Sequence, residues 1–247
     1  TCGYSINALI DFEDEFEILE HLIIGSEGTL AFIEEITYYT VEDLKDKASS
    51  LIYFKDIKEA CSAVTKLKLA KEANTINVEA VELMDRAGLA SIENDPAMPA
   101  FIKDFDENVT ALLIETRAIS DAQLDIQTAQ IEELLKEFSV VRDIYFTKDV
   151  AEYTLYWKIR KGLFPAVGAV RVTGTTVIIE DVAYPIECLA DATLELQDLF
   201  KKHGYSEALI FGHALEGNFH FVFTQDFSDA KEVKRYDDFM NDVVHSV

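Results

Sequence analysis

The alternation of strand-like and helix-like segments constrains the fold of this chain more than any other feature. From residue 50 onward, short β-branched or aromatic runs alternate with amphipathic runs in which apolar residues recur every three or four positions. The predicted strands are 50–56, 76–84, 108–118, 140–149 and 174–185, with a β-hairpin over 207–226, and the main predicted helices are 57–73, 120–138, 150–167, 186–205 and 228–247. Two similar passes indicate an α+β fold, a duplicated ferredoxin-like antiparallel sheet with helices on one face.

Individual residues predict where some of these elements begin and end. The Ser-Asp pair at 120–121 is typical of a helix N-cap, and Gly204 is typical of a C-terminal cap. Pro165 has no backbone N–H, so it predicts the end of its helix. Before the alternation begins, residues 21–30 predict a helix end and a glycine loop, and residues 31–41 predict a strand.

Composition restricts the partners of the protein. The 247 residues carry a net charge of −24, and such a field repels a phosphate backbone, so we expect no nucleic-acid partner. No apolar run approaches the roughly 18–20 residues that a membrane-spanning helix needs. The three cysteines, Cys2, Cys61 and Cys188, lie far apart and predict reduced thiols in a cytoplasmic protein.

A charged connector at 41–48 is the expected boundary between two domains, residues 1–46 and residues 47–247. The chain begins with Thr1 instead of Met, and its last residues stop inside a predicted helix. Both ends predict that the chain is an internal piece of a longer protein.

The stretch IIGSEGTLAFI contains two glycines three positions apart. Gly25 and Gly28 can adopt unusual φ angles and lie close to a ligand, while Ser26 and Thr29 offer hydroxyl groups. The N–H groups of such a loop can face a phosphate or the edge of a flavin. A turn that only starts a strand explains the same residues, so both interpretations stay open.

Arg160 and Arg171 stand out in a chain that has few bases. The planar guanidinium group suits carboxylates, so these residues predict a clamp for a small anionic substrate. In so acidic a protein each arginine can instead pair with a neighbouring Glu, and the sequence does not decide between the two.

The stretch FGHALEGNFHFVF places His213 and His220 on either side of a turn. In a hairpin their imidazoles lie close together, and imidazole is a common ligand of zinc-like ions and a common general base. A metal would need a further ligand, for which Glu216 on the turn is the nearest acid. Two structural sheet histidines are the alternative, and a metal-dependent hydrolase is a weaker one because no HExxH spacing exists.

Three motifs in order resemble one protein family. GSEGTLAFIEEIT resembles the GSEGTLGIITEAT signature of the FAD-linked oxidases of the vanillyl-alcohol-oxidase type. LYWKIRKGL is similar to the W-x-I-R-E motif of their D-lactate and D-2-hydroxyglutarate dehydrogenase branch, and GHALEGNFHF is similar to that branch's G-H-x-G-D-G-N-x-H. The flanks resemble a subgroup in which an iron–sulfur module follows the flavin part. The chain departs from these motifs at Ala31 and at Leu215 and Glu216.

The resemblance implies roles for the residues at matching positions. Arg160 matches the arginine that binds the substrate carboxylate, Asn218 matches an asparagine near the substrate, and His213 and His220 match two histidines that bind a divalent metal such as zinc. Arg171 has no counterpart in the simpler dehydrogenases and is the second candidate for a carboxylate contact. The residues that match the FAD-lining loop and strand are Gly25, Ser26, Glu27, Gly28, Thr29, Phe32 and Ile33.

The implied reaction is oxidation of a D-2-hydroxy acid, D-lactate or D-2-hydroxyglutarate, to the 2-oxo acid, with FAD taking the hydride. By resemblance, residues 1–46 are a remnant of the FAD-binding domain and residues 47–247 are a substrate-binding domain truncated at its C-terminus. The family's pyrophosphate-binding half, its catalytic His, a metal-ligand Glu and the iron–sulfur module are all expected outside this piece. We therefore expect the piece to be inactive alone.

Other properties of the parent protein are left open. The electron acceptor is unidentified, and a location at the inner membrane surface is the alternative to a cytoplasmic one. A non-catalytic ferredoxin-like module that binds a small ligand or forms a homodimer is the alternative function, because the site is incomplete.

Overall fold

The computed structural model describes residues 3–94 and 98–247 and divides the chain into two compact units, Thr1–Asp43 and Leu44–Val247. The first unit contains two helices, α1 (Ala8–Asp11) and α2 (Glu15–Ile23). The strand predicted at 31–41 is wrong, because these residues pair with no strand of the described chain and an unpaired extended segment forms no ladder. Several of its large apolar side chains are exposed instead.

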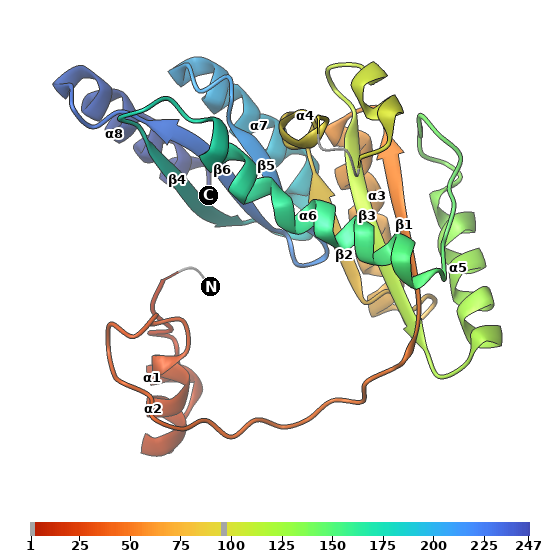
Figure 1. Cartoon of the computed structure of the whole chain (residues 1–247). Helices are drawn as coiled ribbons and strands as arrows, with labels where there is room; N and C mark the ends of the chain where they lie inside the picture. The colour runs from red at the N-terminus through yellow and green to blue at the C-terminus, as the bar shows by residue number, and fades with distance from the viewer. Residues whose placement is uncertain (1–2, 95–97) are drawn as a thin grey trace. The chain divides into compact units, whose positions relative to one another are not determined.

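The second unit is built on a six-stranded sheet in the order β1-β3-β2-β5-β6-β4, and Figure 1 shows it with its helices. Every neighbouring pair is antiparallel, which confirms the predicted antiparallel sheet. The strands are β1 (Asp46–Phe54), β2 (Ala80–Met84), β3 (Thr110–Ala118), β4 (Thr176–Ala183), β5 (Leu209–His213) and β6 (Asn218–Gln225).

Two successive passes of the chain build this sheet. In each pass the third strand lies between the first and the second, and the passes meet where β2 pairs with β5. The helices are α3 (Ile57–Glu72), α4 (Arg86–Ile92), α5 (Asp121–Leu135), α6 (Val150–Val170), α7 (Leu189–His203) and α8 (Ala230–Ser246). A complete ferredoxin-like unit has four strands, whereas each pass contributes three to the described sheet, so the duplicated ferredoxin-like arrangement stays a prediction.

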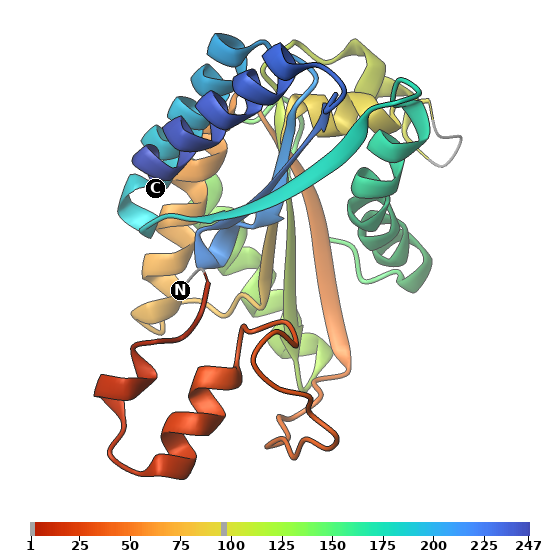
Figure 2. The ribbon, with the colours of Figure 1, turned by 90° about the vertical axis from the view of Figure 1, so that its left-hand side faces the viewer.

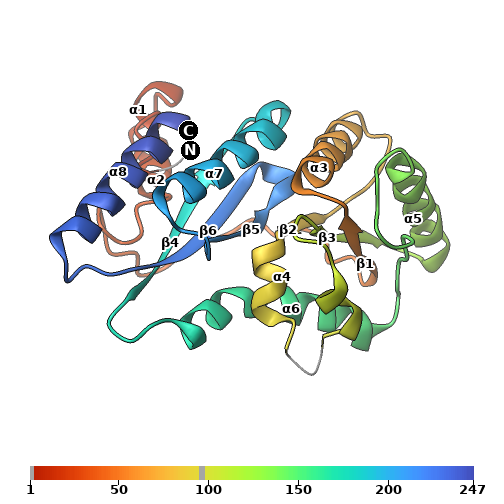
Figure 3. The same cartoon turned by 90° about the horizontal axis from the view of Figure 1, so that it is seen from above.

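Helices cover both faces of the sheet, so the prediction of helices on one face is wrong. Figure 3 shows α3, α5, α7 and α8 on one face and α4 and α6 on the other. The reason is that the central strands have apolar residues on both faces. Leu83 and Phe219 enter the first core, while Met84, Leu113 and Phe211 enter the second, and each apolar face needs its own cover.

The segment predicted as a strand at 140–149 is not one. It meets β1 at two isolated bridges, Phe54 with Val140 and Ser49 with Thr147. Between the bridges the segment has two more residues than β1 has, so the two chains cannot keep a continuous register.

Helix α6 continues through Pro165 to Val170, so the predicted helix end is wrong. Proline removes one intrahelical hydrogen bond. Leu163 and Val167, on either side of it, are both buried against the second core, and this packing holds the helix together across the proline.

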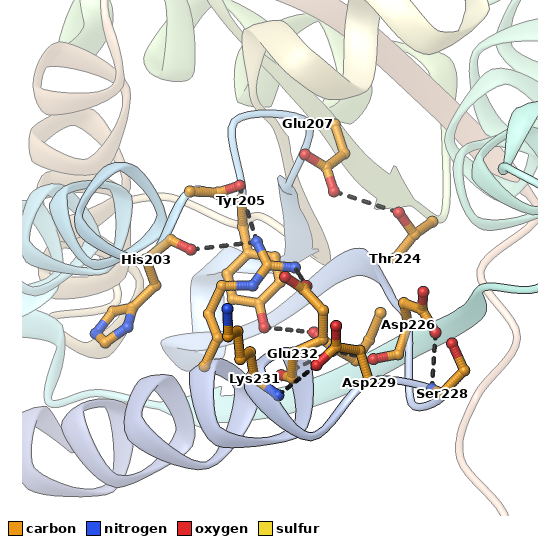
Figure 4. A network of polar contacts seen from close by, with 12 residues as sticks. His203, Tyr205, Glu207, Thr224, Asp226, Ser228, Asp229, Lys231 and Glu232 are labelled. Atoms are coloured by element: carbon orange, nitrogen blue, oxygen red, sulfur yellow. Dashed lines mark hydrogen bonds and ion pairs between the residues drawn. The ribbon is translucent and has the colours of Figure 1, made fainter.

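A polar network fixes the ends of α7, β6 and α8 to one another (Figure 4). The Tyr205 hydroxyl donates to Gln225 Oε1 at 2.6 Å. Arg235 lies over the Tyr205 ring, 4.3 Å from its centroid, and donates to the carbonyls of His203 and Gly204. Gly204 is the left-handed C-cap of α7, as predicted. Figure 2 shows α7 and α8 side by side on this face of the sheet.

Helix α5 begins at the predicted cap. Ser120 is the N-cap of α5 and accepts a hydrogen bond from the backbone of Gln123, as predicted.

In the part of the chain that the structure describes, no helix combines the length and the apolar character needed to cross a membrane.

Candidate active site

The turn between the two predicted histidines depends on two glycines. His213 ends β5, a single 3-10 turn and Gly217 follow, and β6 begins at Asn218. Gly217 has a φ of 66°, and a Cβ there would lie 2.2 Å from the carbonyl oxygen of Tyr184. At Gly212 a Cβ would lie 2.6 Å from the carbonyl oxygen of Asn218. Only glycine at both positions lets the backbone segments of this turn approach so closely.

The antiparallel register brings the polar side chains to one face. Glu82 of β2 pairs with His213, which in turn pairs with Asn218 of β6. In the next row of the same face, Phe211 pairs with His220. Residues paired across antiparallel strands lie on the same face of a sheet, so strands far apart in sequence build one site here.

The two imidazoles lie close together, and each one contacts a carboxylate. Their ring centroids are 5.3 Å apart. His213 Nδ1 is 2.7 Å from Glu82 Oε1, and His220 Nδ1 contacts Asp181 Oδ1 on β4. A carboxylate can only accept, so each Nδ1 carries the proton, and Nε2 offers a lone pair. Neither Nε2 has a hydrogen-bond partner among the described residues, so both are available to a ligand.

Helix α6 places Arg160 beside the same carboxylate. Arg160 Nε donates to Glu82 Oε2 at 2.8 Å, and the guanidinium lies 4.5 Å from the centroid of the Phe211 ring. Arg160 therefore pairs with a Glu, which is one of the two alternatives that the sequence left open. It uses only Nε, and the two terminal nitrogens have no partner in the described chain and are not sealed from solvent. They have no protein partner that a substrate carboxylate would have to displace, and the side chain as a whole is 10% exposed.

Glu82 is a member of the site that the sequence analysis missed. It joins Arg160 to His213 and is 5% exposed. The available signal was an acid inside the strand AVELM, between Val81 and Leu83, both of which are buried. A carboxylate buried in such a strand needs partners, because burial of an unpaired charge is costly.

A second buried carboxylate lies on the neighbouring strand. Glu115 of β3 accepts from Trp157 Nε1 and from Arg117 Nε, both at 2.7 Å. It anchors α6 to the sheet in the same way as Glu82 does, but it has no contact with either histidine.

The donor set for a metal is incomplete in the described residues. They contain no group of three His, Cys, Asp or Glu side chains arranged to hold an ion. Glu216, the nearest acid in sequence, points to Lys68 instead, with Nζ 3.1 Å from Oε2. His213 and His220 would supply two ligands, fewer than the three protein ligands typical of a catalytic zinc, so no step is assigned to a metal.

The cysteines do not form a cluster in the described chain. Cys61 is buried in the first core, and burial raises the pKa of its thiol to about 12. Cys188 is exposed, and Cys2 lies outside the described residues.

The glycine loop of the first unit adopts left-handed conformations at three positions, with φ of 81° at Gly25, 49° at Glu27 and 76° at Gly28. Ser26 and Thr29 use their backbone N–H groups within this unit, and the Thr29 hydroxyl donates to the Ser26 carbonyl at 2.5 Å. The N–H groups of Glu27 and Gly28 have no acceptor among the described residues. The loop therefore fits one edge of a flavin or another group that accepts hydrogen bonds.

Two apolar residues after this loop are accessible. Phe32 is 92% exposed and Ile33 is 47% exposed, so both are available to cover a cofactor or another part of a protein.

The last predicted site residues are Arg171 and Asn218. Arg171 is the C-cap of α6 and donates to the carbonyl of Gly168 at 3.1 Å. At 1.5 Å per residue it lies about 16 Å along the helix from Arg160, so the structure does not bring the two arginines together. Asn218 lies opposite His213 and donates to the Val182 carbonyl at 3.2 Å.

The chain belongs to the family described as FAD linked oxidases, C-terminal domain, whose model matches residues 44–247. It is 29% identical over 82% of its length to a probable mitochondrial D-2-hydroxyglutarate dehydrogenase of Oryza sativa subsp. japonica, covering 34% of that protein. It is 28% identical over 92% of its length to a mitochondrial D-lactate dehydrogenase [cytochrome] of Arabidopsis thaliana, covering 38%. The relatives belong to an enzyme family, and the chain spans only about a third to two fifths of their length.

Solved structures show the same fold. An alkyldihydroxyacetonephosphate synthase structure superposes with a TM-score of 0.59 at 17% identity, over 95% of this chain and 44% of that one. A 4-ethylphenol oxidase from Gulosibacter chungangensis gives 0.54 at 11% identity, over 82% of this chain and 44% of that one.

Proposed function

We propose that this chain is part of a flavin-dependent dehydrogenase that oxidises a D-2-hydroxy acid, D-lactate or D-2-hydroxyglutarate, to the 2-oxo acid. Residues 47–247 would be its substrate-binding domain, and residues 1–46 a remnant of its FAD-binding domain. The observation that carries the proposal is one sheet face on which the free end of Arg160 and the Nε2 atoms of His213 and His220 are all available. The dehydrogenase names of the relatives support it.

Arg160 binds the substrate carboxylate in this proposal. Its two terminal nitrogens offer a bidentate contact, while Glu82 and Phe211 hold the rest of the guanidinium. This contact fixes one end of the substrate and orients C2 and its hydroxyl group. Arg171 stays the second candidate for a carboxylate contact, but it lies about 16 Å along α6 from Arg160, farther than the two carboxylates of D-2-hydroxyglutarate are from each other, so this proposal assigns no contact to it.

His213 and His220 lie next to the hydroxyl end. Each Nε2 can accept a hydrogen bond from the 2-hydroxyl group, and Asn218 lies beside them as a further polar contact. Binding of a divalent metal by the two histidines stays a proposal that needs another ligand from outside the described residues. The base that finally takes the hydroxyl proton is also proposed to lie outside this piece.

Bound FAD would supply the acceptor for the hydride from C2. The backbone groups of Glu27 and Gly28, with Phe32 and Ile33, are proposed to form one edge of its site. The rest of that site and an iron–sulfur module are proposed to lie in the remainder of the parent protein, and the electron acceptor is left open. We expect the isolated 247 residues not to bind FAD stoichiometrically and not to turn over.

The test uses the full-length parent protein. It is purified, its flavin spectrum is recorded, and D-lactate and D-2-hydroxyglutarate are added separately without oxygen. Bleaching of the flavin by one D-acid supports the proposal and chooses the substrate. Absence of flavin, or no bleaching by either acid, contradicts it and favours a non-catalytic binding or dimerisation module.

A substitution tests the role of Arg160. Arg160→Lys removes the bidentate contact, so kcat/KM for the D-acid should fall roughly 10–100-fold, mainly through KM. Arg142→Lys is the matched control, because Arg142 lies over the Phe101 ring, which packs against Tyr53 of the edge strand β1 and not against the strands that carry the histidines. Equal kinetics for the two variants would contradict the assignment.

A further inference from the structure

Glu82 makes two strong contacts with two separate oxygens. Oε2 accepts from Arg160 Nε at 2.8 Å, and Oε1 lies 2.7 Å from His213 Nδ1. These partners come from α6 and β5, which lie 78 and 131 residues further along the chain. The carboxylate therefore joins the arginine and the histidine directly.

We propose that Glu82 is a positioning residue that holds Arg160 and His213 in one fixed arrangement and sets the tautomer of His213. Its acceptor-only oxygens keep the proton on His213 Nδ1, which leaves the Nε2 lone pair directed to the ligand. The identity of that ligand, the hydroxyl of a D-2-hydroxy acid, rests on the proposed function.

The other imidazole of the site is held less firmly. The Glu82 side chain is 7% exposed and is also held by Arg160, whereas that of Asp181, which contacts His220, is 58% exposed. The His213 side chain is itself 54% exposed and that of His220 is 20% exposed, so the difference lies in the acids. An exposed carboxylate is screened by water, whereas a buried one held by a second partner accepts a better-oriented hydrogen bond. The tautomer of His213 is therefore the one that the protein fixes.

Replacement of Glu82 by Gln makes a specific prediction about the proton. Arginine has donors only, so the amide oxygen of the glutamine must face Arg160 Nε. The amide NH2 then faces His213 Nδ1 and donates to it. The histidine proton must move to Nε2, and the ligand-facing nitrogen changes from an acceptor to a donor.

Glu115 provides a matched control for this substitution. It is buried on the adjacent strand and also accepts from two N–H donors, those of Trp157 and Arg117. Glu115→Gln therefore removes a comparable buried charge without touching His213.

The first experiment measures the tautomer by NMR of the 247-residue chain with ¹⁵N-labelled histidine, using His213→Gln to assign the resonance among the five histidines. We expect protonated Nδ1 at His213 in the unmodified chain, in Glu82→Asp and in Glu115→Gln, and protonated Nε2 in Glu82→Gln. A proton on Nε2 in the unmodified chain, or no change in Glu82→Gln, overturns the proposal. The unmodified chain and Glu82→Asp keep the test decisive if Glu82→Gln does not fold.

The second experiment uses the full-length parent protein. Glu82→Gln should lower kcat/KM for the D-acid by about 10–100-fold, with Glu82→Asp retaining more activity. A tautomer change without a kinetic effect overturns the positioning role. If the parent oxidises no D-2-hydroxy acid, the proposed function fails while the NMR result on Glu82 stands by itself.

Discussion

The two faces of strands β2, β5 and β6 carry different kinds of side chain. On the first face, Leu83 and Phe219 are fully buried under α3, α7 and α8. On the second, the residues next to them in sequence, Glu82 and His220, belong to the polar site beside Arg160. The same strands therefore serve as core and as site, because successive side chains point to opposite faces.

The difference shows that stability and binding can be changed separately in this sheet. Substitutions of core residues on the first face should affect unfolding, and those of the polar residues on the second should affect the ligand. Trp157 is the only tryptophan, so its fluorescence reports unfolding of the second unit alone.

The largest effect is expected from the pair Phe219 and His220. Phe219→Ala should lower the free energy of unfolding by about 3–5 kcal/mol, because it leaves a cavity in a closely packed aromatic core. His220→Ala should lower it by about 1 kcal/mol or less, because its carboxylate partner Asp181 is 58% exposed and the contact is screened by water. Urea unfolding of the 247-residue chain measures both. Similar losses for the two variants would contradict the division between the faces.

A slightly smaller effect is expected at the turn that joins strands β5 and β6. Gly217→Ala combines a left-handed φ, which costs about 1–2 kcal/mol, with overpacking against the Tyr184 carbonyl, which costs about 1–3 kcal/mol. Gly174→Ala is the control, because its φ of 97° is also left-handed but a Cβ there meets nothing within 4 Å. Urea unfolding should show the larger loss for Gly217→Ala, and equal losses would exclude the backbone clash.

Asp85 is a buried acid that, unlike Glu82, has no cationic partner among the described residues. It caps α4 by accepting from Gly88 N–H, and burial raises its pKa from 3.8 to about 7. The folded state therefore keeps a proton that the unfolded chain releases, so the contribution of Asp85 is complete below about pH 4 and is lost as pH rises to about 7. A shift of this size corresponds to about 4 kcal/mol at most.

The test compares unfolding at pH 5 and pH 8. Asp85→Asn keeps a good N-cap and cannot ionise, so its stability should fall less than that of the unmodified chain between these two values. Identical falls in the two proteins would show that Asp85 ionises normally in the folded state.

The smallest effect is expected for an ion pair at the rim of the first face. Lys68 on α3 contacts Glu216 on the turn at 3.1 Å, and the glutamate is largely exposed. Lys68→Ala should therefore change the free energy of unfolding by about 1 kcal/mol or less, and salt should reduce the difference further. A loss above 2 kcal/mol in urea would mean that this pair holds the turn in place.

Local patterns predicted most of the elements in the second unit. The capping residues Ser120 and Gly204 and the hairpin around His213 were correct, because caps, turns and short-range periodicity depend on neighbours in sequence. The segment at 140–149 has strand-like composition, but its register with β1 does not match. That mismatch depends on a strand about ninety positions earlier, and local composition does not contain it.

Some residues of the site were predicted from the sequence and others were found only in the structure. His213, His220 and Arg160 were predicted from motifs, and the structure brings them to one face. Arg171 was predicted as a second carboxylate contact, and because helix α6 continues past Pro165, it lies at the far end of that helix from Arg160. Glu82 was missed, because its role depends on partners on β5 and α6 that are adjacent to it only in the folded chain.

Apart from the segments at 31–41 and 140–149, the sequence alone determined the order of strands and helices, together with the glycines of the tight turn and the types of side chain available for chemistry. These depend on backbone conformation and on the repeat of apolar residues, which are local properties. Only the tertiary structure decided that helices cover both faces, that Phe219 belongs to the core while His220 belongs to the site, and that Glu82 joins the arginine to the histidine. Those facts follow from strand register and helix packing between distant segments, where burial selects one arrangement.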